Sequence, residues 1–351
     1  MQNIIIVGGY GAVGNIIARE LSAVFPGRVI IAGRNFEKAR QLSKRLDGKV
    51  LPLQLDLRGH YDQDILANIY LVIMCIDQQD TRFVNSCIER GIDYIDISAN
   101  QNLLEKIEAM DEDARKSGSR VILSVGLAPG LTNLLARHCL NRLGGADSLD
   151  LFILLGLGEK HGEYAYRWTM DNFHKEYEIG LAGGKRLLQS FTNPKTADLS
   201  GWRKFYLFDF ADQHRLSKIP GLKEVMTRMA FDSRILTTAV ALMRKLGLTR
   251  LFKNPKVQSF LIPVFRVLPF GTDIWQIKTT AEKNGRQISC SLKGHGEGKI
   301  TAYTTVLVAK HLLSKAEGKG VMHIDELVID IPGFLVGLEH YEQHIEIKMA
   351  D

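Results

Sequence analysis

The amino-acid sequence predicts an α/β protein with two domains: an N-terminal doubly wound parallel sheet and a second, mixed α+β domain. Strand and helix patterns alternate from the first residue to about residue 130, as expected when each parallel strand is followed by a helical crossover. Beyond that point the rhythm changes. A hairpin signal, Asn284-Gly285, then separates two runs that favour antiparallel strands.

The first domain is expected to contain six strands. We place them at residues 1–8, 28–32, 50–55, 71–76, 94–97 and 121–125. The run 71–76 is the most apolar of the six, which favours a central strand covered on both faces. Right-handed crossovers between such strands predict the spatial order 3-2-1-4-5-6, with ligands bound outside the carboxyl ends of the strands.

The second domain combines strand and helix patterns. We expect strands at 149–155, 204–208, 274–281 and 287–293, and helices at 164–177, 234–247 and 300–314. The predicted domains are therefore 1–130 and 131–351, with the 300–314 helix as a candidate to pack back against the first. The segment 257–270 is rich in bulky apolar residues and is expected at a domain or subunit interface; a lid or a membrane-surface contact is the alternative.

The composition excludes several classes of protein. The chain is 45% hydrophobic and 24% charged, with 45 basic and 39 acidic residues. It has no dense basic stripe, which argues against nucleic-acid binding. The four cysteines form no C-x-x-C motif and no zinc-like cluster, so we expect reduced thiols, a cytoplasmic location and no metal site. No signal peptide is recognised, and no run of about 18 apolar residues predicts a membrane-spanning helix.

The first strand leads directly into a glycine-rich turn. Residues 9–14 read Gly9-Tyr10-Gly11-Ala12-Val13-Gly14, a G-x-G-x-x-G pattern between a strand and a helix. Gly9 permits the tight turn, Gly11 lets a pyrophosphate approach the backbone, and Gly14 lets helix and strand pack closely. The N–H groups at the start of the helix favour phosphate, so this segment predicts a dinucleotide site.

The end of the second strand indicates which dinucleotide binds. An acidic residue there would bind the free ribose 2′-hydroxyl of NAD, but the sequence has Gly33-Arg34-Asn35. Arg34 offers a planar fork suited to a 2′-phosphate, and Lys38 adds charge one turn later. Asn35 is a plausible helix N-cap. NADP is therefore the predicted cofactor, although Arg34 as a solvated surface residue is the alternative.

Further contacts to this cofactor are expected where the other strands end. Asp56, Asp77, Gln78, Ser98 and the loop beginning at Gly126 all fall at the carboxyl ends of predicted strands. Tyr94 and Asp96 alternate on the fifth strand, and we expect them to face opposite sides of the sheet. For both, a structural hydrogen bond is expected in preference to a catalytic role.

Four segments together resemble a known family. They are Gly8 to Gly14, Ala32-Gly33-Arg34-Asn35, Gly91-Ile92-Asp93-Tyr94-Ile95-Asp96-Ile97-Ser98 and Gly126-Leu127-Ala128-Pro129-Gly130-Leu131-Thr132-Asn133. In this order they resemble the saccharopine dehydrogenase-like family of NADP-dependent oxidoreductases. The resemblance is thin in the second domain, so it implies the cofactor contacts and leaves the substrate open.

Candidate acid–base residues are sought in the second domain. Arg167 and His174 lie at helical spacing, where Arg167 suits a substrate carboxylate and His174 suits proton transfer; a solvent-facing helix with salt bridges is the plainer alternative. His295, in a glycine-rich loop, ranks next. No Ser/His/Asp arrangement is expected to compete with these residues.

These observations predict an enzyme that transfers hydride to or from a C–N bond of an amino acid or amino-acid-derived secondary amine. A reductase of a ketone, aldehyde or enoyl substrate is the first alternative. The second is a non-catalytic NADP-binding redox sensor or docking protein. A small, carboxylate-bearing substrate and a homodimer are also expected.

Overall fold

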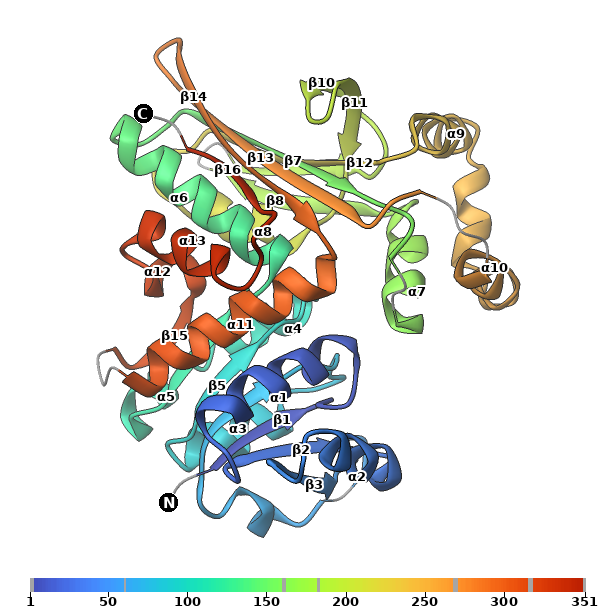
Figure 1. The fold of residues 1–351 in the computed structure, drawn as a ribbon. Helices are drawn as coiled ribbons and strands as arrows, with labels where there is room; N and C mark the ends of the chain where they lie inside the picture. The colour runs from blue at the N-terminus through green and yellow to red at the C-terminus, as the bar shows by residue number, and fades with distance from the viewer. Residues whose placement is uncertain are drawn as a thin grey trace. The chain divides into compact units, whose positions relative to one another are not determined.

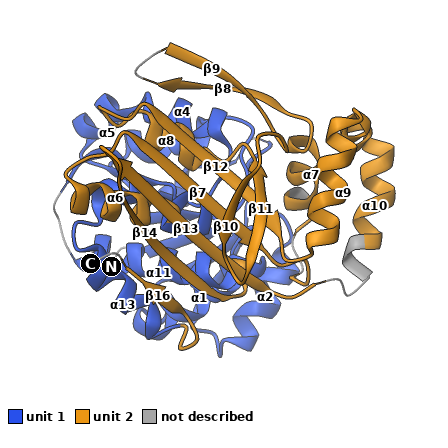
Figure 2. Cartoon of the chain, turned by 90° about the horizontal axis from the view of Figure 1, so that it is seen from above, with its two compact units in different colours: residues 1–131, 298–341 blue, residues 132–297, 342–351 orange. Residues whose placement is uncertain are grey.

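The computed structural model describes residues 3–59, 61–159, 162–181, 184–267, 271–314 and 318–349. Its contacts divide the chain into two compact units, each made of two segments (Figure 2). Unit 1 comprises Met1–Leu131 and Gly298–Tyr341; unit 2 comprises Thr132–Glu297 and Glu342–Asp351. These units differ from the predicted domains, 1–130 and 131–351, in the segment from residue 298 to residue 341.

Unit 1 is built on a seven-stranded parallel sheet (Figure 1). In chain order its strands are β1 (Asn3–Val7), β2 (Val29–Gly33), β3 (Val50–Gln54), β4 (Ile69–Met74), β5 (Asp93–Asp96), β6 (Arg120–Leu123) and β15 (Gly320–His323). The spatial order β15-β6-β5-β4-β1-β2-β3 confirms the predicted order 3-2-1-4-5-6. Strand β15, which the sequence analysis did not predict, adds a seventh strand beside β6.

Helices follow the strands of unit 1. They are α1 (Ala12–Val24), α2 (Phe36–Arg45), the 3₁₀ turn η1 (Gln63–Leu66), α3 (Arg82–Glu89), α4 (Gln101–Glu108), α5 (Asp111–Ser117), α11 (Glu297–Ser314), α12 (Ile324–Leu327) and α13 (Ile331–Glu339). Helix α1 buries Ile17 and Leu21 and packs against β1 and β2, whose residues are almost all buried. This apolar packing fixes the position of the turn that joins β1 to α1.

Unit 2 contains a second seven-stranded sheet, of mixed direction. Its strands, in spatial order, are β10 (Lys195–Asp198), β11 (Trp202–Leu207), β12 (Glu224–Phe231), β7 (Ser148–Leu155), β13 (Ile274–Lys283), β14 (Arg286–His295) and β16 (Glu346–Lys348). Only the β12–β7 pair is parallel among the pairings described in this sheet. The predicted hairpin at Asn284-Gly285 is confirmed, because β13 and β14 pair antiparallel on either side of it. The predicted α/β class, with a parallel sheet and a second mixed domain, is confirmed as well.

The remaining elements of unit 2 are helices and one small hairpin. They are α6 (Thr132–Leu143), α7 (Glu163–Asn172), β8 (Glu176–Leu181), β9 (Gly184–Gln189), α8 (Ala211–Ser217), α9 (Arg234–Lys245), the 3₁₀ turn η3 (Leu248–Lys253) and α10 (Pro255–Val267). The predicted helix 164–177 is wrong at its end, because the chain leaves α7 at Asn172 and enters β8. None of the described helices has the length and hydrophobicity needed to cross a lipid bilayer.

Candidate functional site

The turn between β1 and α1 has a geometry that requires its glycines. Gly8 lies at φ +82°, a left-handed conformation, and a Cβ on Gly14 would stand 2.4 Å from the carbonyl oxygen of Gly8. The N-cap residue Gly11 carries no side-chain cap, and the first turn of α1 holds no acidic residue. The N–H groups at the start of α1 therefore face no competing carboxylate, and the turn fits a pyrophosphate.

The second half of a dinucleotide site lies at the end of β2. The ring of Tyr10 lies so close to Gly33 that a Cβ there would stand 2.5 Å from it, and the N–H of Asn35 donates to Tyr10 Oη at 3.1 Å. Asn35 Oδ1 accepts from the N–H of Lys38 at 3.0 Å and caps α2, as expected from the sequence. Arg34 and Lys38 are both exposed beside this cap, so their charges are available to a 2′-phosphate.

Asp56, which we predicted as a cofactor contact, is already engaged by a neighbour. Arg58 donates to Asp56 Oδ1 from Nε at 3.1 Å and to Oδ2 from a terminal nitrogen at 2.9 Å. These bonds, the backbone bond from Arg58 and the nearby charge of Arg34 lower the pKa of Asp56 to about 2. No sequence motif marks Arg58 as a partner of Asp56. Two guanidinium groups thus lie near one carboxylate, which favours an anion at this end of the sheet.

A buried hydrogen-bond network connects the ends of β4 and β5. Gln78 Nε2 donates to Tyr94 Oη at 2.7 Å and to Asp96 Oδ2 at 3.2 Å, and Tyr94 Oη donates to the same carboxylate at 3.0 Å. The N–H of Ser98 donates to Asp96 Oδ1 at 2.7 Å, and Ser98 Oγ lies 3.5 Å from Asp77. The expectation that Tyr94 and Asp96 face opposite sides is wrong, because residues two apart in a strand share a face. Burial raises the pKa of Asp96 to about 6.

The loop after β6 follows a strained residue. Ser124 is fully buried and lies at φ +57°, where residues other than glycine are uncommon. Its Oγ lies 2.8 Å from His323 Nδ1, and His323 Nε2 lies 2.8 Å from Glu108 Oε1. This Ser–His–carboxylate arrangement was not foreseen from the sequence. Since Ser124 has no exposed surface, the arrangement supports the loop that begins at Gly126 and is not an accessible nucleophile.

Two of the predicted catalytic residues, Arg167 and His174, have different partners. Arg167 forms an ion pair with Glu163 at 2.8 Å and donates to Gln258 Oε1 at 3.0 Å. His174 lies beyond the end of α7 and has other partners. The helical spacing that placed Arg167 and His174 on one face therefore does not extend to His174.

Both ring nitrogens of His174 are engaged. Nδ1 lies 2.6 Å from Thr249 Oγ1, Nε2 accepts from Arg250 Nε at 3.1 Å, and Arg244 lies 3.1 Å from both nitrogens. Burial, together with the charges of Arg244 and Arg250, lowers the pKa of His174. A proton carrier needs a free nitrogen that faces its substrate. The geometry therefore gives no support to His174 in that role.

The third predicted residue, His295, lies at the end of β14. Its Nδ1 is 2.7 Å from Asp273 Oδ1, and both side chains are about half exposed. This exposed pair orients the imidazole without removing it from solvent. Its catalytic assignment stays a prediction.

A different cluster combines a histidine, a carboxylate and a lysine. Asp209, which follows β11, is buried; its Oδ1 lies 2.6 Å from Nε2 of His214 on α8, and its Oδ2 lies 2.6 Å from Lys175 Nζ. Burial alone would raise the pKa of Asp209, but His214 and Lys175 outweigh it and the pKa is lowered. Among the described residues, His214 Nδ1 has no hydrogen-bond partner. This is the arrangement of an oriented acid–base histidine.

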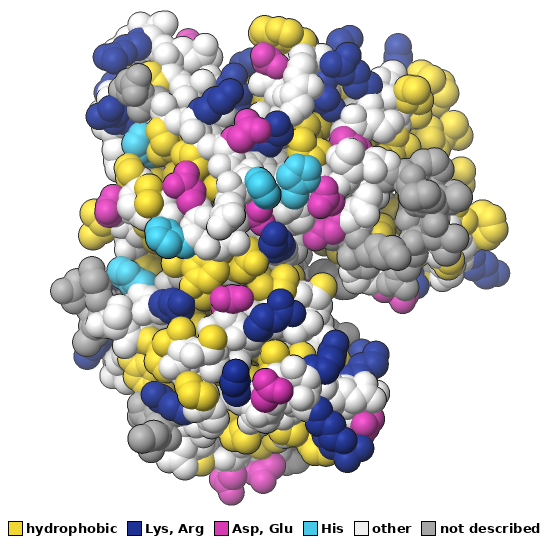
Figure 3. All heavy atoms as spheres, in the orientation of Figure 1, with side chains coloured by type: hydrophobic (Ala, Val, Ile, Leu, Met, Phe, Trp, Pro, Cys, Tyr) yellow, Lys and Arg dark blue, Asp and Glu magenta, His cyan; other side chains and the backbone are white. Residues whose placement is uncertain are grey.

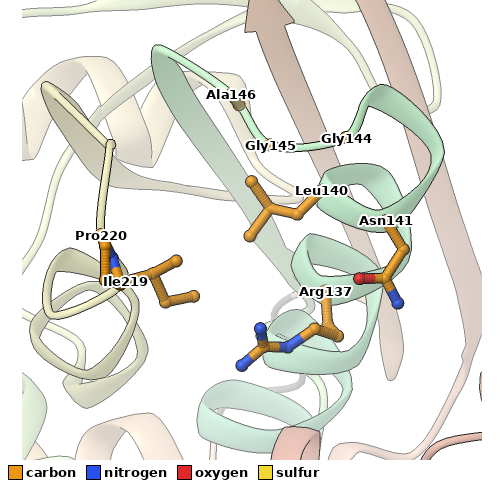
Figure 4. Close-up of a pocket in the computed structure, with 8 residues that line it drawn as sticks. All are labelled: Arg137, Leu140, Asn141, Gly144, Gly145, Ala146, Ile219 and Pro220. Carbon is orange, nitrogen blue, oxygen red and sulfur yellow. The ribbon is translucent and has the colours of Figure 1, made fainter.

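A pocket of about 510 Å³ lies elsewhere in unit 2 (Figure 4). It is lined by Arg137, Leu140, Asn141, Gly144, Gly145, Ala146, Ile219 and Pro220. Figure 4 shows Leu140 of α6 and Ile219 pointing into the same apolar space. No residue of the His214 cluster lines it, so the pocket and that cluster are separate features of unit 2.

Comparison with known proteins finds a family match for the first part of the chain. Residues 4–122 match the family model of the saccharopine dehydrogenase NADP-binding domain. A carboxyaminopropylagmatine dehydrogenase of Synechocystis sp. is 27% identical over 154 residues, which are 40% of this chain and 38% of that protein. This match therefore spans less than half of the curated relative.

The solved structures add evidence on the fold. Apo saccharopine dehydrogenase (L-Glu forming) from Saccharomyces cerevisiae superposes with a TM-score of 0.65 at 15% identity, covering 99% of this chain and 100% of that one. At this identity the likeness concerns the fold, and it extends over both units. The predicted family resemblance is confirmed over the N-terminal part of the chain, which matches the model of the saccharopine dehydrogenase NADP-binding domain.

Proposed function

We propose that the protein is an NADP-dependent oxidoreductase that acts on the C–N bond of an amino acid or an amino-acid-derived secondary amine. The observation that carries the proposal is the combination of an NADP-binding domain with the Asp209–His214–Lys175 cluster in the other unit. Bound NADP supplies the hydride chemistry at C4 of its nicotinamide ring. The chain itself must then bind the substrate and move a proton at its nitrogen.

His214 is our candidate for that proton transfer. Its Nε2 is held by the carboxylate of Asp209, which fixes the orientation of the ring. Its Nδ1 is left to receive a proton from the substrate amine in the oxidative direction and to return it in the reverse direction. A histidine suits this role because its unperturbed pKa lies near neutral pH.

Lys175 is our candidate for binding a substrate carboxylate. Its ammonium is held at 2.6 Å from Asp209, while 41% of the side chain stays exposed. An ammonium group has three donors, so one bond to Asp209 leaves donors for an anionic substrate. Arg167 is a weaker candidate for binding the carboxylate, because its guanidinium already donates to Glu163 and Gln258.

The position of α8 supports this assignment. The loop that begins at Gly126, predicted to contact the cofactor, runs directly into α6 at Thr132. Helix α6 packs against α8, which carries His214. Within unit 2, His214 thus lies on a helix that packs against the helix following that loop in the chain.

The experiment compares His214→Asn with His174→Asn and His295→Asn in the full-length protein. NADPH consumption is measured with a panel of 2-oxo acids, each paired with amino acids or diamines. The His214 variant should lose about 10²–10⁴-fold in kcat with NADPH affinity unchanged, because general acid–base catalysis is worth that much. The other two variants should keep most of their activity.

The outcomes distinguish the alternatives. Turnover that needs no amine would replace our proposal with a ketone, aldehyde or enoyl reductase. Tight NADPH binding without turnover on any substrate would point to the redox sensor or docking protein. Loss of activity in His295→Asn with an active His214→Asn would move the acid–base role to His295. The predicted homodimer and cytoplasmic location remain proposals, to be tested by analytical ultracentrifugation and cell fractionation.

A further inference from the structure

One continuous segment of unit 2 carries positive charge without any negative charge. Residues 234–264 contain six basic residues and no aspartate or glutamate, whereas the whole chain has 45 basic and 39 acidic residues. The six are Arg234, Arg244, Lys245, Arg250, Lys253 and Lys256. The segment forms α9, η3 and most of α10, which lie together at one end of unit 2 in both ribbon views (Figures 1 and 2).

The same segment exposes large apolar side chains. Six of the fourteen large hydrophobic residues that are exposed in the described chain belong to it: Ile235, Leu242, Leu246, Leu248, Leu251 and Phe260. Ile235 is 84% exposed and Phe260 is 72% exposed. Figure 3 shows hydrophobic side chains gathered at the outer edge of this end of unit 2. We call these six apolar residues and the five exposed basic residues (Arg234, Lys245, Arg250, Lys253 and Lys256) the α9–α10 surface.

The exposed apolar residues of α9 are spaced so that they share one side of the helix. Ile235, Leu242 and Leu246 are separated by seven and four residues, so they lie along one side of the helix. Thr237 and Val240 lie on the other side and are buried against the body of unit 2. Helix α9 therefore has a second apolar stripe in addition to the one that its own core uses.

In the described part of the structure none of the six basic residues of this segment forms an ion pair with a carboxylate. Arg250 contacts His174. Arg244 lies nine residues after Ile235, on the opposite side of α9, where it is half-buried, contacts His174 and donates to the Ser190 carbonyl oxygen, so it does not belong to this surface. An apolar stripe surrounded by unpaired cations is the composition of helices that lie in the interface of an anionic membrane.

We propose that the α9–α10 surface docks on an anionic phospholipid membrane, with its leucines, Ile235 and Phe260 in the headgroup region and its lysines and arginines on the phosphates. A second copy of the chain fits less well, because two cationic surfaces repel each other. A nucleic acid would use the cations but would gain nothing from exposed aliphatic side chains. This inference does not depend on the proposed enzymatic function.

The test is sedimentation of the purified full-length protein with vesicles. Binding is expected to vesicles of equal parts phosphatidylcholine and phosphatidylserine, to weaken as salt is added, and to be slight with phosphatidylcholine alone. The triple variant Lys245→Glu, Lys253→Glu, Lys256→Glu should lower the partition coefficient at least about 100-fold, since each basic residue near an anionic surface contributes roughly fivefold. NADPH affinity should not change and serves as the folding control.

A matched control reverses three other exposed lysines, Lys44, Lys49 and Lys204, and so changes the net charge by the same amount. It should bind vesicles within about twofold of wild type, because only charges close to the membrane act. The double variant Ile235→Asn, Phe260→Asn should bind about tenfold less tightly at unchanged charge.

Three results would overturn the proposal. They are the absence of binding to the anionic vesicles, an equal loss of vesicle binding in the control and test triple variants, and binding that does not depend on phosphatidylserine. Self-association abolished by Ile235→Asn, in a protein that ignores vesicles, would assign the surface to a second copy instead.

Discussion

The buried carboxyl group of Asp96 should make the stability of unit 1 depend on pH in a direction that a single substitution can reverse. Its ordinary pKa of 3.8 is raised to about 6 by burial in the folded state. A carboxyl whose folded pKa is raised stabilises the fold fully below its unfolded pKa, and this contribution is lost as pH rises through the folded value. The shift of about two units corresponds to about 3 kcal/mol above pH 6.

Asp96→Asn removes the charge while keeping most of the hydrogen bonds. Its amide oxygen can accept from the N–H of Ser98 as the carboxylate does. Its amide nitrogen would meet Gln78, whose Oε1 is buried and has no hydrogen-bond partner among the described residues. Rotation of the Gln78 amide then satisfies both groups. We expect the variant to gain up to about 3 kcal/mol at about pH 8 and nothing at about pH 3.5.

The assay is urea denaturation followed by far-UV circular dichroism at a series of pH values. Tryptophan fluorescence alone would miss the effect, because the three tryptophans, Trp168, Trp202 and Trp275, all belong to unit 2. Hydrogen exchange of the β5 amides localises the change to unit 1.

Asp80→Asn is the control of opposite sign. A backbone hydrogen bond from Arg82 lowers the pKa of Asp80, so its charge stabilises the fold above its unfolded pKa. That variant should lose stability at neutral pH and recover it as pH falls. If Asp96→Asn destabilised the protein at about pH 8, or shifted stability equally at every pH, the ionised buried carboxylate would not be the destabilising group.

Two further predictions concern the cofactor and the core. Arg34→Asp should shift the preference from NADPH toward NADH by about 1.5–3 kcal/mol, measured by titrating both nucleotides against their fluorescence; equal affinities in wild type would remove the role of Arg34. Asp93→Ala should destabilise unit 1 by about 3–5 kcal/mol in denaturant, because it leaves the guanidinium of Arg120 buried without its ion partner; a change below about 1 kcal/mol would show that Tyr70 and the Leu312 carbonyl suffice.

The parallel sheet of unit 1 could be predicted because its information is local. Each strand is a short apolar run followed by its own helix, and the order follows from the handedness of the crossovers. Strand β15 escaped prediction for the opposite reason. Its four residues, Gly320–His323, form a strand only by pairing with β6, which lies about 200 positions earlier in the chain. No local pattern marks such a segment.

The sequence does contain a pattern that marks where the predicted helix 164–177 ends. In β8, Tyr177 and Ile179 are buried while Glu176 and Glu178 are exposed, which is a period of two. That period indicates a strand, and it competes with the helical spacing of Arg167, Asp171 and His174. The structure follows the apolar alternation: α7 ends at Asn172, so His174 lies on no face of that helix.

The cofactor-binding residues of the proposed site could be predicted from the sequence, but the acid–base residues could not. The glycine turn and Arg34 lie within one strand–helix–strand unit, so their spacing alone carries the chemistry. Lys175, Asp209 and His214 come from a loop, a strand end and a helix, and only tertiary packing brings them to one carboxylate.

What distinguishes the histidines is therefore invisible in a sequence. His174 has both ring nitrogens engaged, and two arginines surround it. His295 is half exposed beside an exposed aspartate. Only His214 of these three combines a nitrogen fixed by a buried carboxylate with a second nitrogen that no described residue occupies. Proton transfer needs both an oriented imidazole ring and a free ring nitrogen. The partners of each histidine and their burial therefore decide which histidine can act as the acid–base group. The presence of a histidine in a plausible segment does not decide it.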